Sequence, residues 1–501
     1  MKSLRLSLII CLSIVFTLEA VFCIPANAQS SESKTSQDKS TVSERIRRIE
    51  SGLLPPFQIK GESTAKMNIA DRMKHYKVPG ISVAVINNGK IEWQRSYGVK
   101  EAGKNEPISV DTMFQAASIS KPVAAMAALK MVQDGKFSLD EDVNKKLVSW
   151  KMPENEFTKE RKVTLRGLLS HGAGLTVSGF PGYASDKPLP SVVQILDGSA
   201  PANTKPVRVQ EAPGTRWSYS GGGITVMQLL MTDVSGKLFP KLMQDAVLKK
   251  LDMKNSTYEQ PLPAQFHSQA AAAHNSKGEK IAGNWHVYPE MAAAGLWTTP
   301  SDLARFAIEL QQARAGKSKK VISPEMARQM LTKQIGAWGL GITLSGEGAS
   351  ARFSHGGSNE GYRCSLVAYN ETGQGAVVMT NSDNGDQLIN EIMRAVAAEY
   401  GWVDYLTKEK TIINLESKIF EGYKGQYQFG TAGNFTVLTE DGKLKIQLGG
   451  EKKYELLPES ETIFFLREMP LEVIFVKDTN GNVTEMVHFY NKQEFRLKKI
   501  K

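Results

Sequence analysis

Cysteine is scarce in this 501-residue chain, with Cys11, Cys23 and Cys364 as the three examples. Cys11 and Cys23 lie in an N-terminal segment that we expect to be removed, so the mature protein would keep Cys364 alone and form no internal disulfide. No histidine adjoins Cys364 in the sequence, which favours a small buried thiol over a nucleophile. The chain must therefore rely on the size of its hydrophobic core, and its length predicts two or more folded units.

Several chemical signatures are also missing. The chain has no Gly-x-Ser-x-Gly segment for a nucleophile elbow and no pair of histidines at metal-ligand spacing. The segment Gly316-Lys317-Ser318 lacks the first glycine of a phosphate-binding loop, because Gln311 stands in its place. The formal charge is +10, but no basic patch interleaved with aromatic residues indicates nucleic acid. We therefore expect no cofactor, no metal and no nucleic-acid partner.

Long apolar runs are confined to the N-terminus. Lys2 and Arg5 precede an apolar core at 6–16, and Ala26-Asn27-Ala28 is a small-x-small cleavage site. Residues 1–28 are therefore expected to be a signal peptide cleaved near Ala28, which predicts a periplasmic or secreted protein. No other stretch is long and apolar enough to span a bilayer, so no membrane-spanning segment is expected in the mature chain.

The expected elements divide the rest of the chain into three parts. Residues 29–60 are typical of a flexible tether followed by a short helix. Within 61–405, strands at both ends with helices between them predict one antiparallel sheet flanked by helices. Within 406–501, eight short period-2 segments at about ten-residue spacing predict a separate small β-barrel. The predicted fold class is thus α/β, of the α+β kind, with a C-terminal barrel.

Individual elements between 61 and 405 follow from periodicity and turn signals. The expected strands are 81–86, 91–97, 338–344, 351–355, 362–369 and 376–381. The expected helices are 69–76, one that follows Ser118, 139–148, 163–175, 224–234, one capped near Ser301, and 387–400. Residues 176–215 are rich in proline and glycine and are expected to form a long surface loop that shapes access to a pocket.

The segment 114–129, FQAASISKPVAAMAAL, contains the first candidate for chemistry. Its pattern places Ser118 at the mouth of a helix, with Lys121 one turn on and on the same face. A serine hydroxyl is a weak nucleophile until a base lies beside it, and a lysine can be that base. The helix N-terminus also offers a backbone N–H to an oxyanion. Because Ser-x-x-Lys is a common spacing, the assignment depends on motifs further along the chain.

Two downstream motifs support it. Tyr219-Ser220-Gly221 offers a phenol that can relay a proton, although tyrosine is also a common core residue. His355-Gly356-Gly357-Ser358 ends an expected strand, where consecutive glycines let a substrate backbone approach a strand edge. The N–H of Ser358 can then serve as a second oxyanion donor, while the alternative for this motif is a tight turn. Residues 295–299 are expected to line the same cleft.

In this order, Ser118-x-x-Lys121, Tyr219-Ser220 and His355-Gly356-Gly357 resemble the class C β-lactamase and penicillin-binding-protein superfamily. Residues 164–175 and 293–304 look like the same family, and the resemblance covers roughly residues 65–400. It implies the β-lactamase/DD-peptidase-like fold, an antiparallel sheet with a helical subdomain. It also implies an acyl-enzyme mechanism in which Ser118 is the nucleophile, Lys121 and Tyr219 share the base role and Ser358 lies in the oxyanion strand.

Two residues depart from the family pattern. Gly221 stands where the family has an asparagine that binds the substrate's amide side chain. His355 stands where it has a lysine near the substrate carboxylate, and histidine is charged only part of the time at neutral pH. Both substitutions resemble the esterase, D-aminopeptidase and uncharacterised hydrolase branches. The C-terminal barrel resembles the lipocalin-like domain appended to some of those enzymes.

Together with the expected signal peptide, the resemblance implies an exported serine hydrolase that acts on an ester or on a D-amino-acid-containing peptide or amide. Cell-wall fragments are one source of such a substrate. Because of His355, we expect the activity to vary over the pH range where histidine titrates. Two alternatives remain open: a β-lactamase or D-alanyl-D-alanine carboxypeptidase, and a penicillin-binding-like sensor or scaffold that is acylated without turnover.

Overall fold

The computed structural model describes residues 41–63, 67–428, 433–447, 452–467, 469–490 and 493–500. The expected signal peptide, 1–28, lies outside the described residues, as does the expected tether up to residue 40. In the described part of the chain, no helix combines the length and the apolar character needed to cross a membrane.

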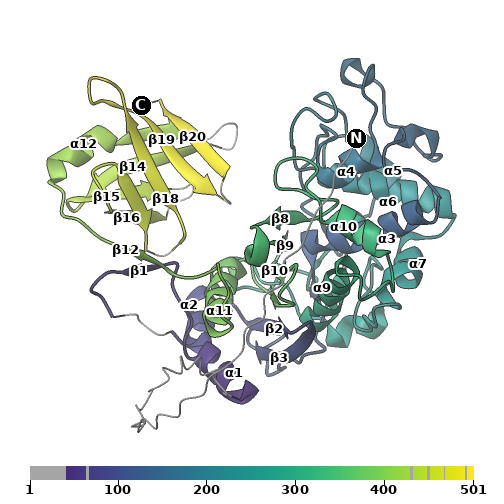
Figure 1. Ribbon diagram of the computed structural model, residues 1–501, viewed down its shortest axis with the longest axis horizontal. Coiled ribbons are helices and arrows are strands. Elements are labelled where there is room, and N and C mark those ends of the chain that lie inside the picture. Colours follow the sequence, from purple (N-terminus) through teal and green to yellow (C-terminus); the bar gives the residue numbers. More distant parts are fainter. Residues whose placement is uncertain are drawn as a thin grey trace, which may run out of the picture. The chain divides into compact units, whose positions relative to one another are not determined.

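A six-stranded antiparallel sheet organises the larger part of the chain (Figure 1). Its order is β3-β2-β11-β10-β9-β8. The strands are β2 (Gly80–Asn87), β3 (Lys90–Gly98), β8 (Thr343–Ser345), β9 (Arg352–Asn359), β10 (Tyr362–Tyr369) and β11 (Gly375–Thr380). Strands from the two ends of the sequence thus form one sheet, as the sequence predicts.

Alternating residues of the central strands enter two different cores. In β11, Val377 and Met379 face the larger core, while Ala376 and Val378 face the smaller one. This period of two is the strand geometry that buries both faces of a sheet. Each face is therefore covered by helices.

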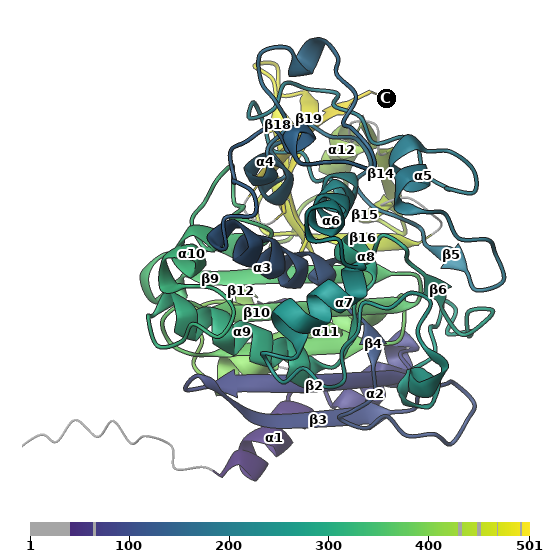
Figure 2. The ribbon, with the colours of Figure 1, turned by 90° about the vertical axis from the view of Figure 1, so that its right-hand side faces the viewer.

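The smaller core is covered by helices near the two ends of this part (Figure 1): α1 (Val42–Glu50), α2 (Ile69–Tyr76) and α11 (Gly385–Glu399). The larger core lies under the helical subdomain, where α3 (Ser120–Gln133) and α9 (Pro300–Arg314) are prominent (Figure 2). Its other helices are α4 (Leu165–Ser170), α5 (Val192–Asp197), α6 (Gly221–Ser235), α7 (Phe239–Met243), α8 (Met291–Ala294) and α10 (Pro324–Met330). The candidate residues Ser118 and Lys121 lie just before and within the first turn of α3, on this face of the sheet.

The helix predicted at 139–148 is wrong, because only the short 3₁₀ turn Val143–Lys145 forms there. The Asp142 side chain accepts the N–H of Asn144, at 3.0 Å, in place of a helical carbonyl. Short polar side chains compete with the helix in this way.

The strand predicted at 338–344 is also largely wrong, since β8 begins only at Thr343. Gly341 has φ +84°, and a Cβ built on it would lie 2.5 Å from the Cβ of Ala125 in α3. The chain therefore turns where it packs closely on α3, and it pairs with β9 only from Thr343 onward. The helix predicted at 163–175 is shorter, because His171 ends α4 in the left-handed region, at φ 57°.

All eight strands predicted near the C-terminus form, and they close into a barrel in sequential order from β13 to β20. They are β13 (Gly425–Gln428), β14 (Asn434–Glu440), β15 (Lys443–Gln447), β16 (Lys453–Pro458), β17 (Ile463–Leu466), β18 (Glu472–Lys477), β19 (Val483–Tyr490) and β20 (Gln493–Lys499). Side chains such as Tyr427, Phe464 and Phe475 fill its interior together with the short helix α12 (Phe420–Tyr423).

A short parallel ribbon joins the two strand systems. It pairs β1 (Phe57–Ile59) with β12 (Lys408–Lys410). The Lys410 side chain is 8% exposed, and its Nζ lies 2.6 Å from carboxylate oxygens of both Glu459 and Glu472. It also lies over the rings of Phe57 and Phe465, at 5.5 and 5.6 Å from their centroids. The predicted division at residue 406 stays a prediction.

Candidate active site

The turn before α3 holds Ser118 in an unusual backbone setting. The short strand β4 (Phe114–Gln115) pairs with β7 (Trp297–Thr298), and the Ala116 N–H then donates to Leu296 O at 2.8 Å. Ala117 is fully buried and adopts φ 48°, which an alanine rarely does. Ser118 follows in a 3₁₀ turn and is half-buried at the N-terminus of α3. The sequence prediction of a serine at the mouth of a helix is confirmed.

Lys121 lies within hydrogen-bonding distance of that serine. Its Nζ is 2.9 Å from Ser118 Oγ, and it donates to Ala293 O, in α8, at 2.7 Å. Lys121 is only 2% exposed. The amine is thus held between the serine and a backbone carbonyl and is shielded from bulk water, which is the setting an amine base needs.

Tyr219 lies beside Lys121. It precedes α6, whose N-cap Ser220 accepts the Gly223 N–H at 2.9 Å. The Nζ of Lys121 is 5.2 Å from the centroid of the half-buried Tyr219 ring. The fold therefore brings Ser118, Lys121 and Tyr219 together although a hundred residues separate the tyrosine from the serine.

His355 reaches the site from β9. Its ring centroid is 6.5 Å from that of Tyr219, and its Nδ1 is 2.6 Å from Gly356 O. Burial, and after it the positive charge of Lys121, lowers the pKa of His355 to about 3. The expectation that this histidine titrates near neutral pH is therefore corrected: the ring is neutral there.

The second half of β9 has a free edge among the described strands. β8 pairs with β9 only as far as Ser354, so Gly356 to Ser358 have no strand on that side. A Cβ built on Gly357 would lie 2.3 Å from Ala116 O and from Cys364 Sγ, so only glycine allows β9 so close to the nucleophile turn. Ser358 is exposed at this edge.

Cys364 lies beneath the same turn. It is 3% exposed, and its Sγ donates to Ala116 O at 3.1 Å. Burial raises the pKa of the thiol. The sequence prediction of a buried, unreactive cysteine is consistent with both observations.

Gly221 is the first residue of α6, and the loop before it covers this position. Its N–H donates to Ser178 O at 3.1 Å. A Cβ built on Gly221 would lie 3.0 Å from the Phe180 ring and 3.1 Å from Ser178 O. The space that a side-chain amide would need is thus occupied by residues 178–180.

Three more residues with aromatic rings surround Tyr219 and His355, and the sequence predicted no role for them. His171, Trp217 and Trp338 join Tyr219 and His355 in what we call the aromatic cluster. The His171 ring lies 4.3 Å from Tyr219 and 4.6 Å from Trp338, and Trp217 stacks on Trp338 at 6.0 Å. The sequence pointed to His171 only in that it lies within residues 164–175, which resemble the family. Trp338 was assigned to a strand that does not form.

Glu290 is another group that the sequence did not reveal. It immediately precedes α8 and its residue is 0% exposed. Burial raises the pKa of this carboxyl to about 7, although its own backbone N–H and the Tyr183 hydroxyl act in the opposite direction. A carboxyl whose pKa lies near neutral therefore lies three residues from the carbonyl that holds Lys121.

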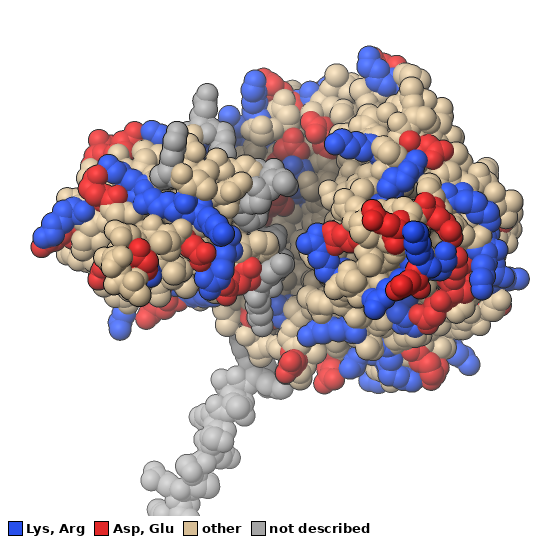
Figure 3. Space-filling model, turned by 90° about the horizontal axis from the view of Figure 1, so that it is seen from above, with Lys and Arg blue, Asp and Glu red and all other residues tan. Residues whose placement is uncertain are grey.

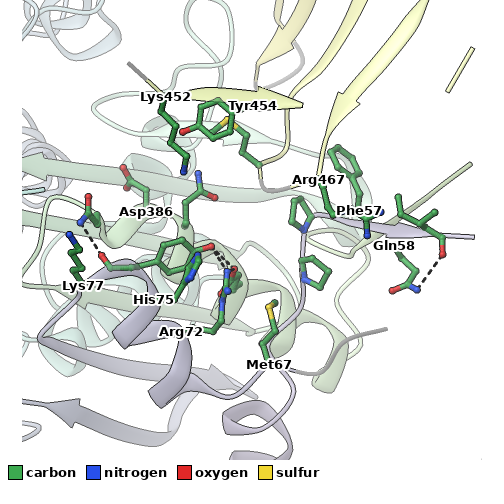
Figure 4. Close-up of a pocket in the computed structure, with 18 of the residues that line it drawn as sticks. Phe57, Gln58, Met67, Arg72, His75, Lys77, Asp386, Lys452, Tyr454 and Arg467 are labelled. Atoms are coloured by element: carbon green, nitrogen blue, oxygen red, sulfur yellow. Dashed lines mark hydrogen bonds and ion pairs between the residues drawn. The ribbon is translucent and has the colours of Figure 1, made fainter. Parts of the chain in front are cut away.

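The structure also contains a cavity of about 810 Å³ away from Ser118 (Figure 4). Arg72 and His75 from α2, Phe57 from β1 and Tyr454 from the barrel are among its walls. In that wall the Arg72 guanidinium pairs with a Glu391 carboxylate, at 2.6 Å. Of the described residues that line it, none belongs to the site around Ser118.

Charges of both signs are interspersed over the described surface of the sheet-and-helix part that Figure 3 shows. Many charged side chains of the described residues form ion pairs, for example Arg166 with Asp140 at 2.6 Å. On that face, the net positive charge of the chain is thus not gathered into one patch.

Two family models match separate parts of the chain. The family model described as Beta-lactamase matches residues 65–399. A second model, a domain of unknown function (DUF3471), matches residues 409–500. The first match contains Ser118, Lys121, Tyr219 and His355.

Relatives and solved structures agree with this match. Penicillin-binding protein 4* of Bacillus subtilis (strain 168) is 24% identical over 425 residues, which cover 79% of this chain and 89% of that protein. The octameric penicillin-binding protein homologue from Pyrococcus abyssi has a TM-score of 0.58 at 21% identity, covering 86% of this chain and 98% of that one. The D-amino acid amidase from Ochrobactrum anthropi SV3 has a TM-score of 0.54 at 21% identity, covering 66% and 97%. These similarities, together with the family match over most of its length, show that the chain belongs to the β-lactamase family of serine hydrolases, which includes penicillin-binding proteins.

Proposed function

We propose that this chain is an exported serine hydrolase that forms an acyl-enzyme on Ser118 and acts on an ester or a D-amino-acid-containing peptide or amide. The observation that supports this most directly is the 2.9 Å contact between Ser118 Oγ and the buried Nζ of Lys121. A hydroxyl beside an amine that is shielded from water has the base that a serine nucleophile needs.

In the proposed reaction, the base is Lys121 Nζ. It accepts the Ser118 proton while Oγ bonds to the substrate carbonyl carbon, and the backbone N–H groups of Ser118 and Ser358 stabilise the oxyanion. The proton then passes by way of Tyr219 to the leaving group, whose bond to the carbonyl carbon breaks. Water hydrolyses the acyl ester by the same path in reverse, which returns the proton to Ser118.

The preference for esters or D-aminoacyl substrates over β-lactams rests on two residues. Gly221 supplies no side-chain amide for an acylamino group, and the Phe180 ring lies where such an amide would extend. The His355 ring is neutral, because its pKa is lowered to about 3, so it gives a substrate carboxylate no fixed positive charge. The chain also shares its fold with a D-amino acid amidase, and this similarity of fold supports an amide as the substrate.

Export is part of the same proposal. It is supported by the charged start, the apolar core and the small-x-small site within residues 1–28. The test is N-terminal sequencing of the mature protein from a cell that expresses the full chain. A mature N-terminus close to residue 29 is expected, whereas an intact Met1 would contradict export through a cleaved signal.

The test of the activity compares two probes on the purified protein. A fluorophosphonate and a fluorescent penicillin are applied side by side, and the labelled residue is mapped by mass spectrometry. The values of kcat/KM are then compared for p-nitrophenyl acetate, a D-alanyl anilide and nitrocefin. We expect the fluorophosphonate on Ser118 and faster turnover of the ester or the anilide than of nitrocefin.

Other results would favour the alternatives. Efficient nitrocefin turnover, with the ester and the anilide untouched, would favour a β-lactamase. A lasting penicillin adduct without turnover of any of the three substrates would favour a sensor or scaffold.

A further inference from the structure

His171 accepts hydrogen bonds from the backbone N–H groups of Ser218 and Ser220, the residues on either side of Tyr219. The Ser218 N–H donates to the backbone carbonyl of His171 at 2.8 Å. The Ser220 N–H donates to the side-chain Nδ1 of His171 at 3.1 Å. The residues on both sides of Tyr219 are therefore bonded to one histidine.

The conformation of His171 makes this double contact possible. His171 ends α4 in the left-handed region, at φ 57°, and is only 2% exposed. This backbone geometry directs its carbonyl and its ring toward the same segment of chain. The ring then packs on the Tyr219 ring at 4.3 Å, with 40° between the ring planes, and its edge meets Trp338 at 4.6 Å.

The protonation state of His171 fits the role of an acceptor. Since Nδ1 accepts the Ser220 N–H, the neutral ring carries its proton on Nε2. Burial lowers the pKa of His171 well below its usual range, and the charge of Lys121 adds to that effect. Within the described residues the buried Nε2 has no hydrogen-bond partner. An apolar side chain would avoid that cost, so the acceptor at Nδ1 is what histidine adds here.

We propose that His171 is a positioning residue for Tyr219, which fixes the phenol beside Lys121 by holding the backbone N–H groups of Ser218 and Ser220, the residues on both sides of it. The inference rests on the proposed function, because it concerns the proton path to and from Ser118. It assigns His171 no contact with substrate. Correct orientation of a proton-transfer group accounts for a large share of its contribution to the rate, so a loosened Tyr219 slows acylation.

Three substitutions separate this role from simple packing. In His171→Asn, Oδ1 occupies about the position of Nδ1 and can accept the Ser220 N–H, and asparagine tolerates the left-handed region. In His171→Gln, the acceptor lies one bond further out, near the position of Nε2. His171→Leu keeps most of the volume and removes the acceptor.

The experiment measures acylation of Ser118 in the purified full-length mature protein, by fluorophosphonate labelling and by the burst with p-nitrophenyl acetate. We expect His171→Leu and His171→Gln to lower the acylation rate on the order of tenfold with little change in KM, as loss of orientation does. His171→Asn is expected to stay within about threefold of the wild type because the acceptor is kept. In the Tyr219→Phe background, His171→Leu should cause little further loss, since the phenol it positions is absent.

Two results would contradict the proposal. Equal losses in His171→Asn and His171→Gln would show that packing, not the Nδ1 acceptor, matters. An undiminished loss from His171→Leu in the Tyr219→Phe background would show that His171 does not act through Tyr219. If His171→Leu fails to fold, the comparison of the asparagine and glutamine substitutions decides alone. Absence of any wild-type adduct on Ser118 would instead refute the proposed function, which keeps the two failures distinct.

Discussion

In the C-terminal barrel the backbone departs from ordinary geometry at a turn, whereas around Ser118 it does so at partly or fully buried positions. Asp441 has φ 54° in the β14–β15 turn, where Asp-Gly is expected. Near the site, Ala117, His171 and Val177 have φ of 48°, 57° and 63°. For a β-branched residue such as Val177 this is a true outlier. Each such residue costs roughly 1–2 kcal/mol, which the packing around it must offset.

Buried polar groups show the same contrast. The barrel interior consists mainly of apolar and aromatic side chains such as Ile446, Phe464 and Phe475. Around Ser118, the described ring nitrogens His171 Nε2, Trp217 Nε1 and His355 Nε2 are buried without a hydrogen-bond partner. The barrel is thus arranged for stability, while the surroundings of Ser118 keep backbone strain and unpaired polar atoms.

The largest effect on this comparison is expected from Ser118→Ala. It should abolish covalent labelling and lower kcat by at least about a thousandfold, as loss of a nucleophile does. Thermal unfolding should change little, because Ser118 is half-buried and its side chain contacts Lys121 alone among the hydrogen bonds of the described residues. Labelling of the intact protein, mapped by mass spectrometry, is the measurement.

A matched control is Ser358→Ala, which removes an exposed hydroxyl and keeps the backbone N–H. It should retain the label on Ser118. An adduct on Ser120 or on Ser358 in the wild type would contradict the assignment of the nucleophile.

The next largest effects are expected from the two groups that would share the proton. Lys121→Ala and Tyr219→Phe should each slow acylation on the order of a hundredfold, because general-base catalysis contributes that much. The two groups act as one unit, so the double variant should lose much less than the product of the single losses. Presteady-state burst rates with p-nitrophenyl acetate measure this. Multiplicative losses would mean that the two side chains lie on separate proton paths.

The barrel could be predicted strand by strand because its information is local. Period-2 segments separated by turns such as Asp441-Gly442 and Asn480-Gly481 specify strands without knowledge of distant contacts. The strands β2 and β3, with Asn88-Gly89 in the turn between them, were predicted for the same reason. In these regions, local pattern and final structure agree.

The site was predicted only in part because its geometry depends on distant contacts. The proximity of Ser118 and Lys121 was predicted because one helical turn separates them, whereas the choice of this Ser-x-x-Lys pair depended on motifs further along the chain. The role of His171 depends on bonds to Ser218 and Ser220, which no periodicity shows. Trp338 was assigned to a strand, whereas a close approach to α3 at Gly341 turns the chain there. The low pKa of His355 arises from burial and from Lys121, so the residue type alone gave the wrong expectation.

The buried carboxyl of Glu290 is expected to make the free energy of unfolding depend on pH. Burial raises the pKa of Glu290 from 4.5 to about 7. The folded state therefore holds this proton up to about pH 7, while the unfolded state releases it near 4.5. Its contribution to stability is most favourable below about pH 4.5 and is lost as the pH rises toward 7.

This predicts a difference in pH dependence rather than in absolute stability. Between pH 5 and pH 7 the wild type should lose roughly 2 kcal/mol more than Glu290→Gln, which cannot ionise. Urea denaturation of both proteins at the two pH values measures it. Parallel pH dependences would mean that the carboxyl reaches water in the folded protein.

A smaller effect is expected from the ion pairs beside the barrel. Lys410→Met keeps the contacts with Phe57 and Phe465 but leaves Glu459 and Glu472 without their shared cation. Both carboxylates are more than a quarter exposed, so the loss should be about 1 kcal/mol in the free energy of unfolding. Esterase activity should not change. Lys408→Met is the matched control, since Lys408 is 68% exposed and pairs with Glu472 alone. A large loss of activity in Lys410→Met would show that the ribbon of β1 and β12 influences the site.

The smallest effect is expected from the ionisation of His355 at moderate pH. Its pKa is lowered to about 3, so the ring binds a proton only in strong acid and stays neutral from pH 5 to pH 8. A histidine with an ordinary pKa would add a step near pH 6.5. The pH profile of kcat/KM for p-nitrophenyl acetate should therefore have the same shape between pH 5 and pH 8 in the wild type and in His355→Gln, even if the variant is slower throughout. A step with a midpoint in that range which His355→Gln removes would show that the ring is hydrated in solution, and it would restore the pH sensitivity that the residue type alone suggests.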